Sequence, residues 1–501
     1  MRVLTPRVAL LCLLVALAAA VYAPNLRDYF VSDDFELIGS CFDRSPSYLL
    51  SLLYNNQVGD LWKDWGLDPT AGRGYLRPIP IWLMKLDCMI WGMRPLGFRL
   101  TATAFFAAVI ACVFLILETL QVRRSVAFLT AWGLAIHPIF SAIVPLIWAR
   151  EETVTATFGL VAFCFFLRLR RSGSSAVPVF VFYALALFTK ETAVTWLALP
   201  VGYDLIFGHF RGKAPQDRRR LVAFYGGLFG LAACYLALRW IAFGNMVGGD
   251  AAPTHYFSLD AFIAYHARFF RLLVGARLFD DHGIRALRWV APGAVLVVLA
   301  LAFRRSTGSL WPRRAVFFGP YWYLCATTLF YGIYYDDRHH AFVIVGLGLL
   351  LGLATHVVME PMSRAGRAVL FVVAVAAMTA VWLPATLRNA RQFHEASRVT
   401  ASVREAIDTL TAGLSDGSTV RLVNTPLSPS PPYYFGWGLQ SALRQPFTPS
   451  DCSKRLTIVD AGDLRMNHRA AAVSRFDLEI RFRAKPLGAI ESVRGTPDGR
   501  P

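Results

Sequence analysis

A series of apolar segments, each near the length needed to span a membrane, constrains this chain more than any other feature. A hydrocarbon core about 30 Å thick needs roughly 20 helical residues to cross it. With 55% hydrophobic residues, 17% charged residues and a mean hydropathy of +0.45, the chain is too apolar for a soluble protein. The sequence predicts an all-α polytopic membrane protein with about eleven transmembrane helices, at residues 8–23, 98–120, 126–148, 153–168, 176–189, 192–208, 221–243, 290–303, 316–335, 341–359 and 368–386.

Basic residues gather in every second connection between these segments. The positive-inside rule places such clusters in the cytoplasm, together with the N-terminus. The net charge of +18 therefore reports orientation, and nucleic-acid binding is not predicted. The clusters are Arg123-Arg124; Arg168, Arg170 and Arg171; Arg211, Lys213 and Arg218-Arg219-Arg220; Arg304-Arg305 and Arg313-Arg314; Arg364 and Arg367. The connections expected to face outward are 24–97, 149–152, 190–191, 244–289, 336–340 and everything after about residue 387.

The first apolar segment and the cysteines leave two questions open. Val8 to Ala23 has the look of a signal peptide, but we expect it to stay as a membrane anchor because no soluble domain follows directly. The eight cysteines are scattered and show no CxxC spacing, which argues against a zinc site. An oxidising outer compartment allows a disulfide between Cys41 and Cys88, and two unpaired thiols are the alternative.

The predicted domains are a transmembrane catalytic domain at 1–387 and a small extracytoplasmic α/β domain at 388–501. In the long outer loop 24–97, amphipathic stretches at 47–54 and 80–91 are typical of interfacial helices, as is 259–278 in the second outer loop, 244–289. The C-terminal domain is expected to contain a helix at 389–412, strands at 419–423, 456–459 and 476–482, and a disordered end of about ten residues.

Acidic and basic residues concentrate in the short connections predicted to face outward. Asp33 and Asp34 follow the first segment; taken alone, such a pair also suits a turn that ends a helix. Positive residues are disfavoured outside, so their presence there suggests a bound anionic group such as a lipid phosphate. Pairing with neighbouring acids or snorkelling to the surface would equally explain each one singly. The residues are Arg150, Glu151 and Glu152; Lys190 and Glu191; Asp336, Asp337, Arg338, His339 and His340.

Several short motifs, in order and spacing, resemble the GT-C glycosyltransferases, especially the branch with protein O-mannosyltransferases and TMTC-type mannosyltransferases. They cover most of residues 20–350. The chain departs from the family pattern at Ala142, where relatives commonly have Glu, and at 341–343, where they have Tyr-x-Pro; the tandem helical repeats of the TMTC branch are missing after the membrane domain. The motifs are Tyr22-x-x-Asn25, Phe30-Val31-Ser32-Asp33-Asp34, Tyr75-x-Arg77-Pro78, Leu86-Asp87, Trp91-Gly92, Pro95-x-Gly97-Phe98, His137-Pro138, Arg150-x-Glu152, Lys190-Glu191, and Asp337-Arg338 with Gly346.

The resemblance implies an enzyme that takes a hexose such as mannose from a polyprenyl-phosphate donor on the outer face. Asp33 would be the general base, with Asp34 beside it. Arg77, Arg150, Lys190 and Arg338 would bind the donor phosphate or build the site, together with Glu152, Glu191 and Asp337. One carboxylate base attacking from the opposite face predicts inversion at the sugar carbon.

No metal is required for a monophosphate donor, although His339-His340 with Asp336 and Asp337 offers ligands for a divalent cation. His137, inside a predicted span, is expected to be a buried structural histidine beside a proline kink. The expected partners are the lipid-linked donor, membrane lipids and a protein, lipid or glycan acceptor. Composition suggests a bacterial inner membrane with the site on the periplasmic face.

Two further function classes fit the sequence. A transporter or flippase of lipid-linked sugars would line a path with intramembrane charges, whereas the ionisable residues here gather near one surface. A non-catalytic scaffold would use the C-terminal domain to bind a partner.

Overall fold

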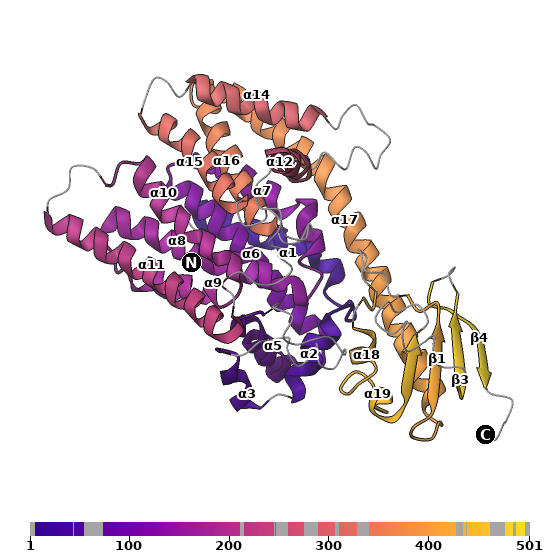
Figure 1. Cartoon of the computed structure of the whole chain (residues 1–501). Coiled ribbons are helices and arrows are strands. Elements are labelled where there is room, and N and C mark those ends of the chain that lie inside the picture. The colour runs from indigo at the N-terminus through magenta and orange to yellow at the C-terminus, as the bar shows by residue number, and fades with distance from the viewer. Residues whose placement is uncertain are drawn as a thin grey trace, which may run out of the picture.

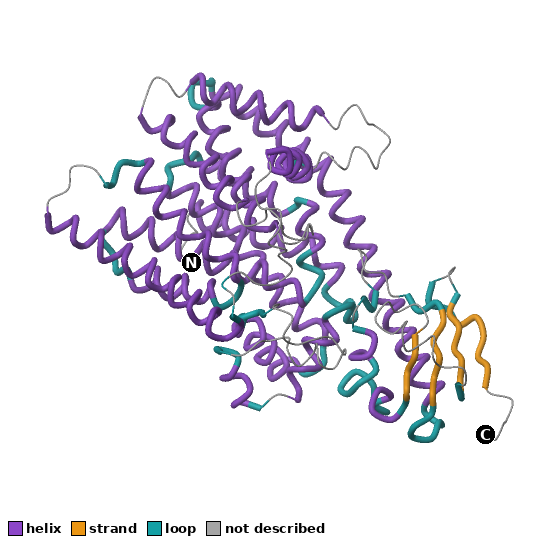
Figure 2. The backbone as a smooth tube through the Cα atoms, viewed as in Figure 1, coloured by secondary structure: helices purple, strands orange, loops and turns teal. Residues whose placement is uncertain are grey.

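The structure, a computed structural model, is a helical bundle joined by one long helix to a small β-sheet (Figure 1; Figure 2). It describes residues 6–43, 45–54, 74–210, 215–244, 246, 259–274, 289–305, 310–327, 340–426, 434–436, 438–460, 476–483 and 487–495.

Every apolar segment of the sequence contributes a helix to the bundle. In the described part of the chain, seven helices are long and apolar enough to cross a membrane, which makes this an integral membrane protein. The helices α9, α10, α14 and α15 are not among these seven, and the count of eleven spans stays a prediction. The bundle helices are α1 (Pro6–Tyr22), α6 (Pro95–Thr119), α7 (Arg124–Ala135), α8 (Glu151–Ser172), α9 (Val177–Leu187), α10 (Ala198–Ile206), α11 (Pro215–Phe243), α14 (Val290–Arg305), α15 (Leu310–Thr327), α16 (Ala341–Met359) and α17 (Arg364–Thr411).

Short helices occur between the long ones, and those at 46–51, 78–91 and 259–273 lie where interfacial helices were predicted. The Trp82 indole N–H of α5 donates to the Leu49 carbonyl of α3 over 2.8 Å, which joins two of them. These elements are η1 (Ala23–Asn25), α2 (Asp34–Asp43), α3 (Pro46–Ser51), α5 (Pro78–Trp91), η2 (Pro138–Ala142), η3 (Trp148–Arg150), η4 (Glu191–Leu197) and α12 (Leu259–Leu273).

The segment 126–148 is broken where a single kinked helix was expected. α7 ends at Ala135, and the 3₁₀ helix η2 restarts at Pro138, because proline has no N–H and clashes with the preceding turn. His137 is buried at the break, and its Nδ1 accepts the Ile139 N–H over 3.3 Å. Its ring lies 4.8 Å from that of Trp382. These contacts place His137 in a structural role.

α17 runs without interruption through the predicted domain boundary at residue 387. The predicted membrane span 368–386 and the predicted helix 389–412 are one helix of 48 residues, about 70 Å long at 1.5 Å per residue. Pro384 lies inside it without ending it. Figure 1 shows α17 leaving the bundle and passing beside the sheet, so the two domains share one rigid element.

The C-terminal domain has the predicted α/β character and one strand more than predicted. Its sheet has the order β2-β1-β3-β4, with β1 parallel to β2 and β3, and β3 antiparallel to β4. β4 corrects the expectation of a disordered end for residues 492–495, which pair with β3, and residues 496–501 lie outside the described residues. The elements are β1 (Thr419–Val423), α18 (Leu439–Ala442), α19 (Cys452–Arg455), β2 (Thr457–Asp460), β3 (Leu478–Phe482) and β4 (Ile490–Gly495).

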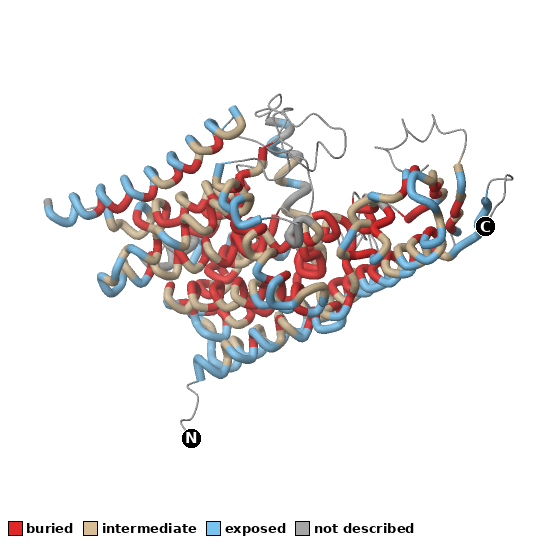
Figure 3. Tube along the Cα trace, turned by 90° about the horizontal axis from the view of Figure 1, so that it is seen from below, coloured by how far each residue is buried: buried red, intermediate tan, exposed pale blue. Residues whose placement is uncertain are grey.

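Two apolar cores hold these parts together. One fills the bundle, where α1 contributes Leu14, Ala18 and Tyr22, with the Tyr22 ring edge-on to Phe106 at 5.3 Å. The second is shared between the loop before α2, the outer half of α17 and the sheet. Figure 3 shows buried residues continuing from the bundle toward the C-terminal domain. Cys88 is buried in this second core, and the side chain of Cys41, its possible disulfide partner, lies outside the described residues.

Contacts between helix ends agree with the alternation of the basic clusters. At one end, Glu118 pairs with both Arg7 and Arg124, at 2.6 and 2.8 Å. The Arg123 N–H donates to His356 Nδ1 over 3.2 Å. These residues all border connections predicted to be cytoplasmic, so the chain brings that set together in space.

Labelling with a membrane-impermeant maleimide tests which end faces outward. Ser172→Cys, at an exposed position after α8, should react only after the membrane is permeabilised, and Ser415→Cys, beyond α17, should react in intact cells. The wild-type chain, with its native thiols, is the background. The reverse labelling would invert the topology.

Candidate functional site

The Asp33 loop begins the site at the junction of α1 and α2. Ser32 has a positive φ of 51°, and its hydroxyl donates to Asp33 Oδ1 over 3.1 Å. The Asp33 carbonyl accepts the Leu37 N–H over 3.1 Å, which makes Asp33 the cap of α2. An acidic side chain is favourable at the positive N-terminal end of a helix. Asp33 is half-buried, so its carboxylate remains reachable.

Asp34 lies one residue further and has a different environment. It is fully buried, Oδ2 accepts the Val31 N–H over 3.2 Å, and Oδ1 accepts the Trp148 N–H of η3 over 2.9 Å. Burial raises the pKa of Asp34 from its ordinary 3.8 to about 6, against the opposing effects of Arg99 and the two backbone N–H groups. The Asp34 side chain thus joins the loop to η3.

The Arg99 side chain links the residues just before the Asp33 loop to the residues just before η3. It is buried in α6; Nε donates to the Asp28 carbonyl over 3.0 Å, Nη2 donates to the Tyr29 carbonyl over 2.6 Å, and Nη1 donates to the Pro145 carbonyl. Arg99 lies inside an apolar segment of the sequence. This position could have marked it as a functional residue, because a buried arginine there needs a specific partner. Sequence reasoning treated the segment only as a span.

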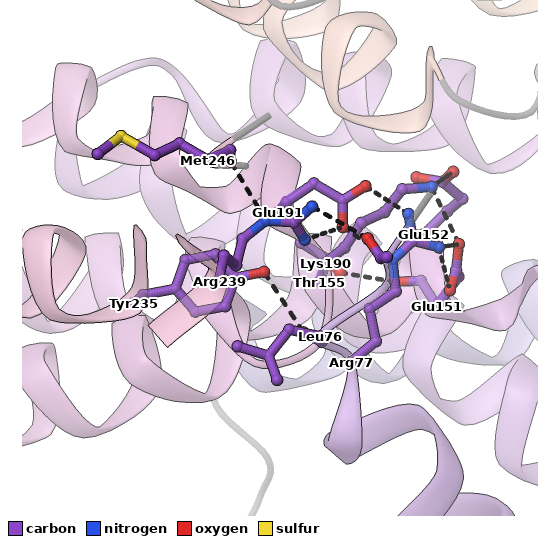
Figure 4. Close-up of polar contacts among 11 residues, drawn as sticks. Leu76, Arg77, Glu151, Glu152, Thr155, Lys190, Glu191, Tyr235, Arg239 and Met246 are labelled. Atoms are coloured by element: carbon purple, nitrogen blue, oxygen red, sulfur yellow. Dashed lines mark hydrogen bonds and ion pairs between the residues drawn. The ribbon is translucent and has the colours of Figure 1, made fainter. Parts of the chain in front are cut away.

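A second group of charges forms where three connections meet the end of α11, at the same end of the bundle (Figure 4). Arg77 Nη1 donates to both Glu151 oxygens over 2.8 and 3.0 Å, and Arg77 Nε and Nη2 donate to Glu191 over 2.8 and 2.5 Å. Lys190 pairs with Glu151 at 3.0 Å and with Glu152. We call Arg77, Lys190, Arg239, Glu151, Glu152 and Glu191 the charged cluster.

Arg239 extends the charged cluster to the end of α11. It is fully buried, lies 3.8 Å from Glu191, and donates to the carbonyls of Gly74 and Met246 over 3.1 and 3.2 Å. Burial opposes ionisation of Glu191, yet Arg77, Arg239 and Lys190 lower its pKa to about 2. Three cations face three carboxylates, so the charged cluster is electrically neutral.

Arg150 belongs to η3, between the Asp33 loop and the charged cluster. Its side chain is 1% exposed and pairs through Nη1 with Asp87, which also accepts the Thr101 hydroxyl over 2.8 Å. In the described part of the chain, Nε and Nη2 of Arg150 have no hydrogen-bond partner. Unsatisfied buried donors on a cation are costly, and an anionic ligand would satisfy them.

The structure brings together most of the predicted site residues. Arg77, Glu152, Lys190 and Glu191 lie in the charged cluster, and Asp34 contacts the element that carries Arg150. Lys190 and Arg150 pair with acids, although with Glu152 and Asp87 rather than with the next residue in sequence. Asp337 and Arg338, with Asp336 and His339, lie outside the described residues. Glu151, Asp87, Arg99 and Arg239 were missing from the predicted set.

No group of three or more His, Cys, Asp or Glu side chains in the described ranges is placed to hold a metal ion.

The fold and these charges define a polytopic membrane protein with one polar site at an end of its bundle. Its fold is similar to that of ArnT from Cupriavidus metallidurans bound to undecaprenyl phosphate, with a TM-score of 0.52 and 14% identity over 95% of this chain and 93% of that one. It is also similar to the archaeal oligosaccharyltransferase AglB from Archaeoglobus fulgidus, in complex with an inhibitory peptide and a dolichol-phosphate. That match has a TM-score of 0.50 and 10% identity over 95% and 69% of the two chains.

Sequence relatives point to one branch of this fold. The chain is 27% identical over 198 residues to the protein O-mannosyl-transferase TMTC3 of Mus musculus, and 28% identical over 186 residues to Tmtc1 of Drosophila melanogaster. These matches cover 38% and 37% of this chain but 21% of each relative, so the chain corresponds to about a fifth of their length. No family model matches the chain. The predicted resemblance is confirmed: the chain is a relative of the TMTC protein O-mannosyltransferases with a GT-C fold.

Neutralising one cation of the charged cluster should destabilise the fold. Arg77→Gln leaves Glu151 and Glu191 without their main partner, which should lower the free energy of unfolding by about 3–5 kcal/mol. The control Lys454→Gln removes a pair whose lysine is 75% exposed and should cost at most about 1 kcal/mol. Denaturant unfolding in detergent measures both; equal effects would contradict a structural role.

The pKa of Asp34 predicts a pH-dependent stability. Between pH 3.8 and about 6 the folded chain binds the Asp34 proton more tightly than the unfolded chain. The free energy of unfolding should therefore fall as pH rises through this window, by up to about 3 kcal/mol, and then level off. Asp34→Asn should remove this component. Parallel pH profiles for the two proteins would show that Asp34 does not titrate in this range.

Proposed function

We propose that this protein is a membrane glycosyltransferase that moves a hexose such as mannose from a polyprenyl-phosphate donor to an acceptor hydroxyl at the extracytoplasmic face. Asp33 is the general base, and the reaction inverts the configuration at the sugar carbon. The proposal follows from the confirmed relationship to protein O-mannosyltransferases together with the different environments of Asp33 and Asp34.

The chemistry requires one base and one anion site. The Asp33 carboxylate takes the proton of the acceptor hydroxyl as its oxygen bonds to the anomeric carbon. The bond from that carbon to the phosphate oxygen breaks, and polyprenyl phosphate leaves with the electron pair. Positive charge near the phosphate stabilises the developing anion. The residues need no metal or organic cofactor for these steps, and a divalent cation stays an untested addition.

Asp33 and Asp34 have different roles in this proposal. Asp33 is half-buried at the tip of its loop, where an acceptor can reach it. Asp34 has both oxygens occupied by backbone N–H groups and keeps the loop against η3. The proposal therefore assigns proton transfer to Asp33 and positioning to Asp34.

Arg150 is the described residue best suited to the donor phosphate. Its free Nε and Nη2 offer donors, and η3 places it two residues after the Trp148 amide that holds Asp34. Arg77 and Lys190 are engaged with the carboxylates of the charged cluster, which supports a framework role for them, with Glu152 and Glu191 as their counter-charges. Arg338 and Asp337 remain proposed donor-side residues.

The solved relatives in fold support a lipid-linked donor. ArnT was solved with undecaprenyl phosphate and AglB with a dolichol-phosphate, so both hold a polyprenyl-type phosphate. The location of the site at the end opposite the basic clusters supports the extracytoplasmic face.

Purified protein in lipid nanodiscs tests the proposal with radiolabelled polyprenyl-phosphate mannose and Ser/Thr peptides. Asp33→Asn should lower the rate of release of polyprenyl phosphate by about 100-fold or more while donor binding persists. The matched control Asp416→Asn removes a carboxylate that is 79% exposed on the C-terminal domain and should leave the rate unchanged. Undiminished turnover in Asp33→Asn, or lipid flipping that survives it without any transfer, would overturn the assignment.

A further inference from the structure

A segment of the C-terminal domain lies directly on the Asp33 loop. The Ser32 N–H donates to the Tyr434 carbonyl over 2.6 Å, which is a backbone contact between residues about 400 positions apart. The segment is Tyr434–Gly438, of which the structure describes Tyr434, Phe435, Gly436 and Gly438. We call these four residues the clamp.

Ser32 needs such a contact because of its backbone conformation. Its φ of 51° lies in the left-handed region, which is unfavourable for a residue with a side chain. A strained conformation of this kind persists only where its surroundings hold it. In this chain the clamp provides a contact that holds Ser32 in this conformation. Asp33 is the next residue in the chain.

Two glycines allow the clamp to approach so closely. A Cβ on Gly438 would lie 2.2 Å from the Ser32 carbonyl oxygen, which is backbone and cannot rotate away. A Cβ on Gly436 would lie 2.4 Å from the Ser32 hydroxyl, a side-chain atom that can move. The two positions therefore contact two separable parts of the same residue.

Aromatic side chains also pack where the Asp33 loop meets the C-terminal domain. Phe35 stacks on Phe435 with ring centroids 5.9 Å apart and meets Phe447 edge-on at 4.9 Å. Phe30 also meets Phe447, at 5.5 Å. The Asp33 loop thus packs on the C-terminal domain both before and after Ser32.

We propose that the clamp is a positioning element for catalysis: by holding Ser32 in its left-handed conformation, the C-terminal domain orients the Asp33 carboxylate toward the acceptor. This inference rests on the proposed function of Asp33 as the base. It makes the C-terminal domain a working part of the active site, in addition to any role in binding the acceptor.

The test is a set of glycine substitutions. Gly438→Ala pushes on the Ser32 carbonyl and should lower kcat by about 100-fold, since a displacement near 1 Å has that effect on aligned groups. The KM for polyprenyl-phosphate mannose should change by less than about twofold, because the donor site is untouched. The control Gly413→Ala adds the same methyl group where nothing lies within 4 Å, and both kcat and KM should match wild type.

A double-mutant cycle distinguishes positioning from general damage. Ser32→Gly removes the hydroxyl that a Gly436 methyl group would displace, so Gly436→Ala should cost less on the Ser32→Gly background than on wild type, and the remaining cost is the strain of alanine at a φ of +50°. Gly438→Ala should keep its full effect on the Ser32→Gly background, because the carbonyl is still present. Additive effects for the Gly436 pair, or equal KM and kcat losses in Gly438→Ala, would overturn the proposal.

Hydrogen exchange provides a readout that does not depend on activity. The Ser32 amide, protected by the Tyr434 carbonyl, should exchange at least about tenfold faster in Gly438→Ala than in wild type or Gly413→Ala. If wild type transfers no sugar but this exchange difference is found, the proposed function fails and the clamp stands as a structural contact only. If the exchange is unchanged, the clamp itself is wrong.

Discussion

Buried charges must be neutralised, and this requirement determines how the connections at one end of the bundle meet. Arg77 and Lys190 come from two connections and Arg239 from the end of α11, and they reach carboxylates at Glu151, Glu152 and Glu191. Each cation would cost several kcal/mol if buried alone. The lowest-energy arrangement therefore draws the connections together, and the helices that carry them are fixed relative to one another. Because these helices are fixed relative to one another, the polar site next to the charged cluster is also held rigidly.

The neutrality of the charged cluster gives a physical reason why its ion pairs would take no direct part in the proposed sugar transfer. A cation that is already paired with carboxylates gains little from binding a phosphate, because the negatively charged phosphate would have to displace a negatively charged carboxylate. Arg150 differs, since Asp87 pairs with Nη1 of its guanidinium and the described residues give Nε and Nη2 no hydrogen-bond partner. Asp34 shows the same logic with the sign reversed. Its carboxylate is satisfied by backbone donors, which supports a positioning role for Asp34 beside the proposed base, Asp33.

Much of the fold could be predicted from the sequence, because hydropathy and the positive-inside rule act locally. All the apolar segments became helices, and the turns at 149–152 and 190–191 did meet, whereas 336–339 lie outside the described residues. Two features depended on distant contacts and were missed. α17 continues past residue 387 because its outer half packs on the sheet through Val403 and Ile407, which composition alone does not reveal. Arg99 and Arg239 sit inside apolar stretches, where their partners are backbone carbonyls or carboxylates far away in sequence.

The length of α17 connects these observations to function. A single helix enters both the bundle and the C-terminal domain, so movement of the sheet relative to the Asp33 loop is resisted at two places: along the helix and at the clamp. Phe30 and Phe35 share a core with Val420, Leu422 and Ile480 of the sheet. Folding of the C-terminal domain and ordering of the Asp33 loop are therefore one cooperative event, because neither side can bury its apolar surface without the other. A carboxylate that must meet an acceptor hydroxyl at a fixed angle gains from this coupling, since the entropy of orienting it is lost during folding and not during the reaction.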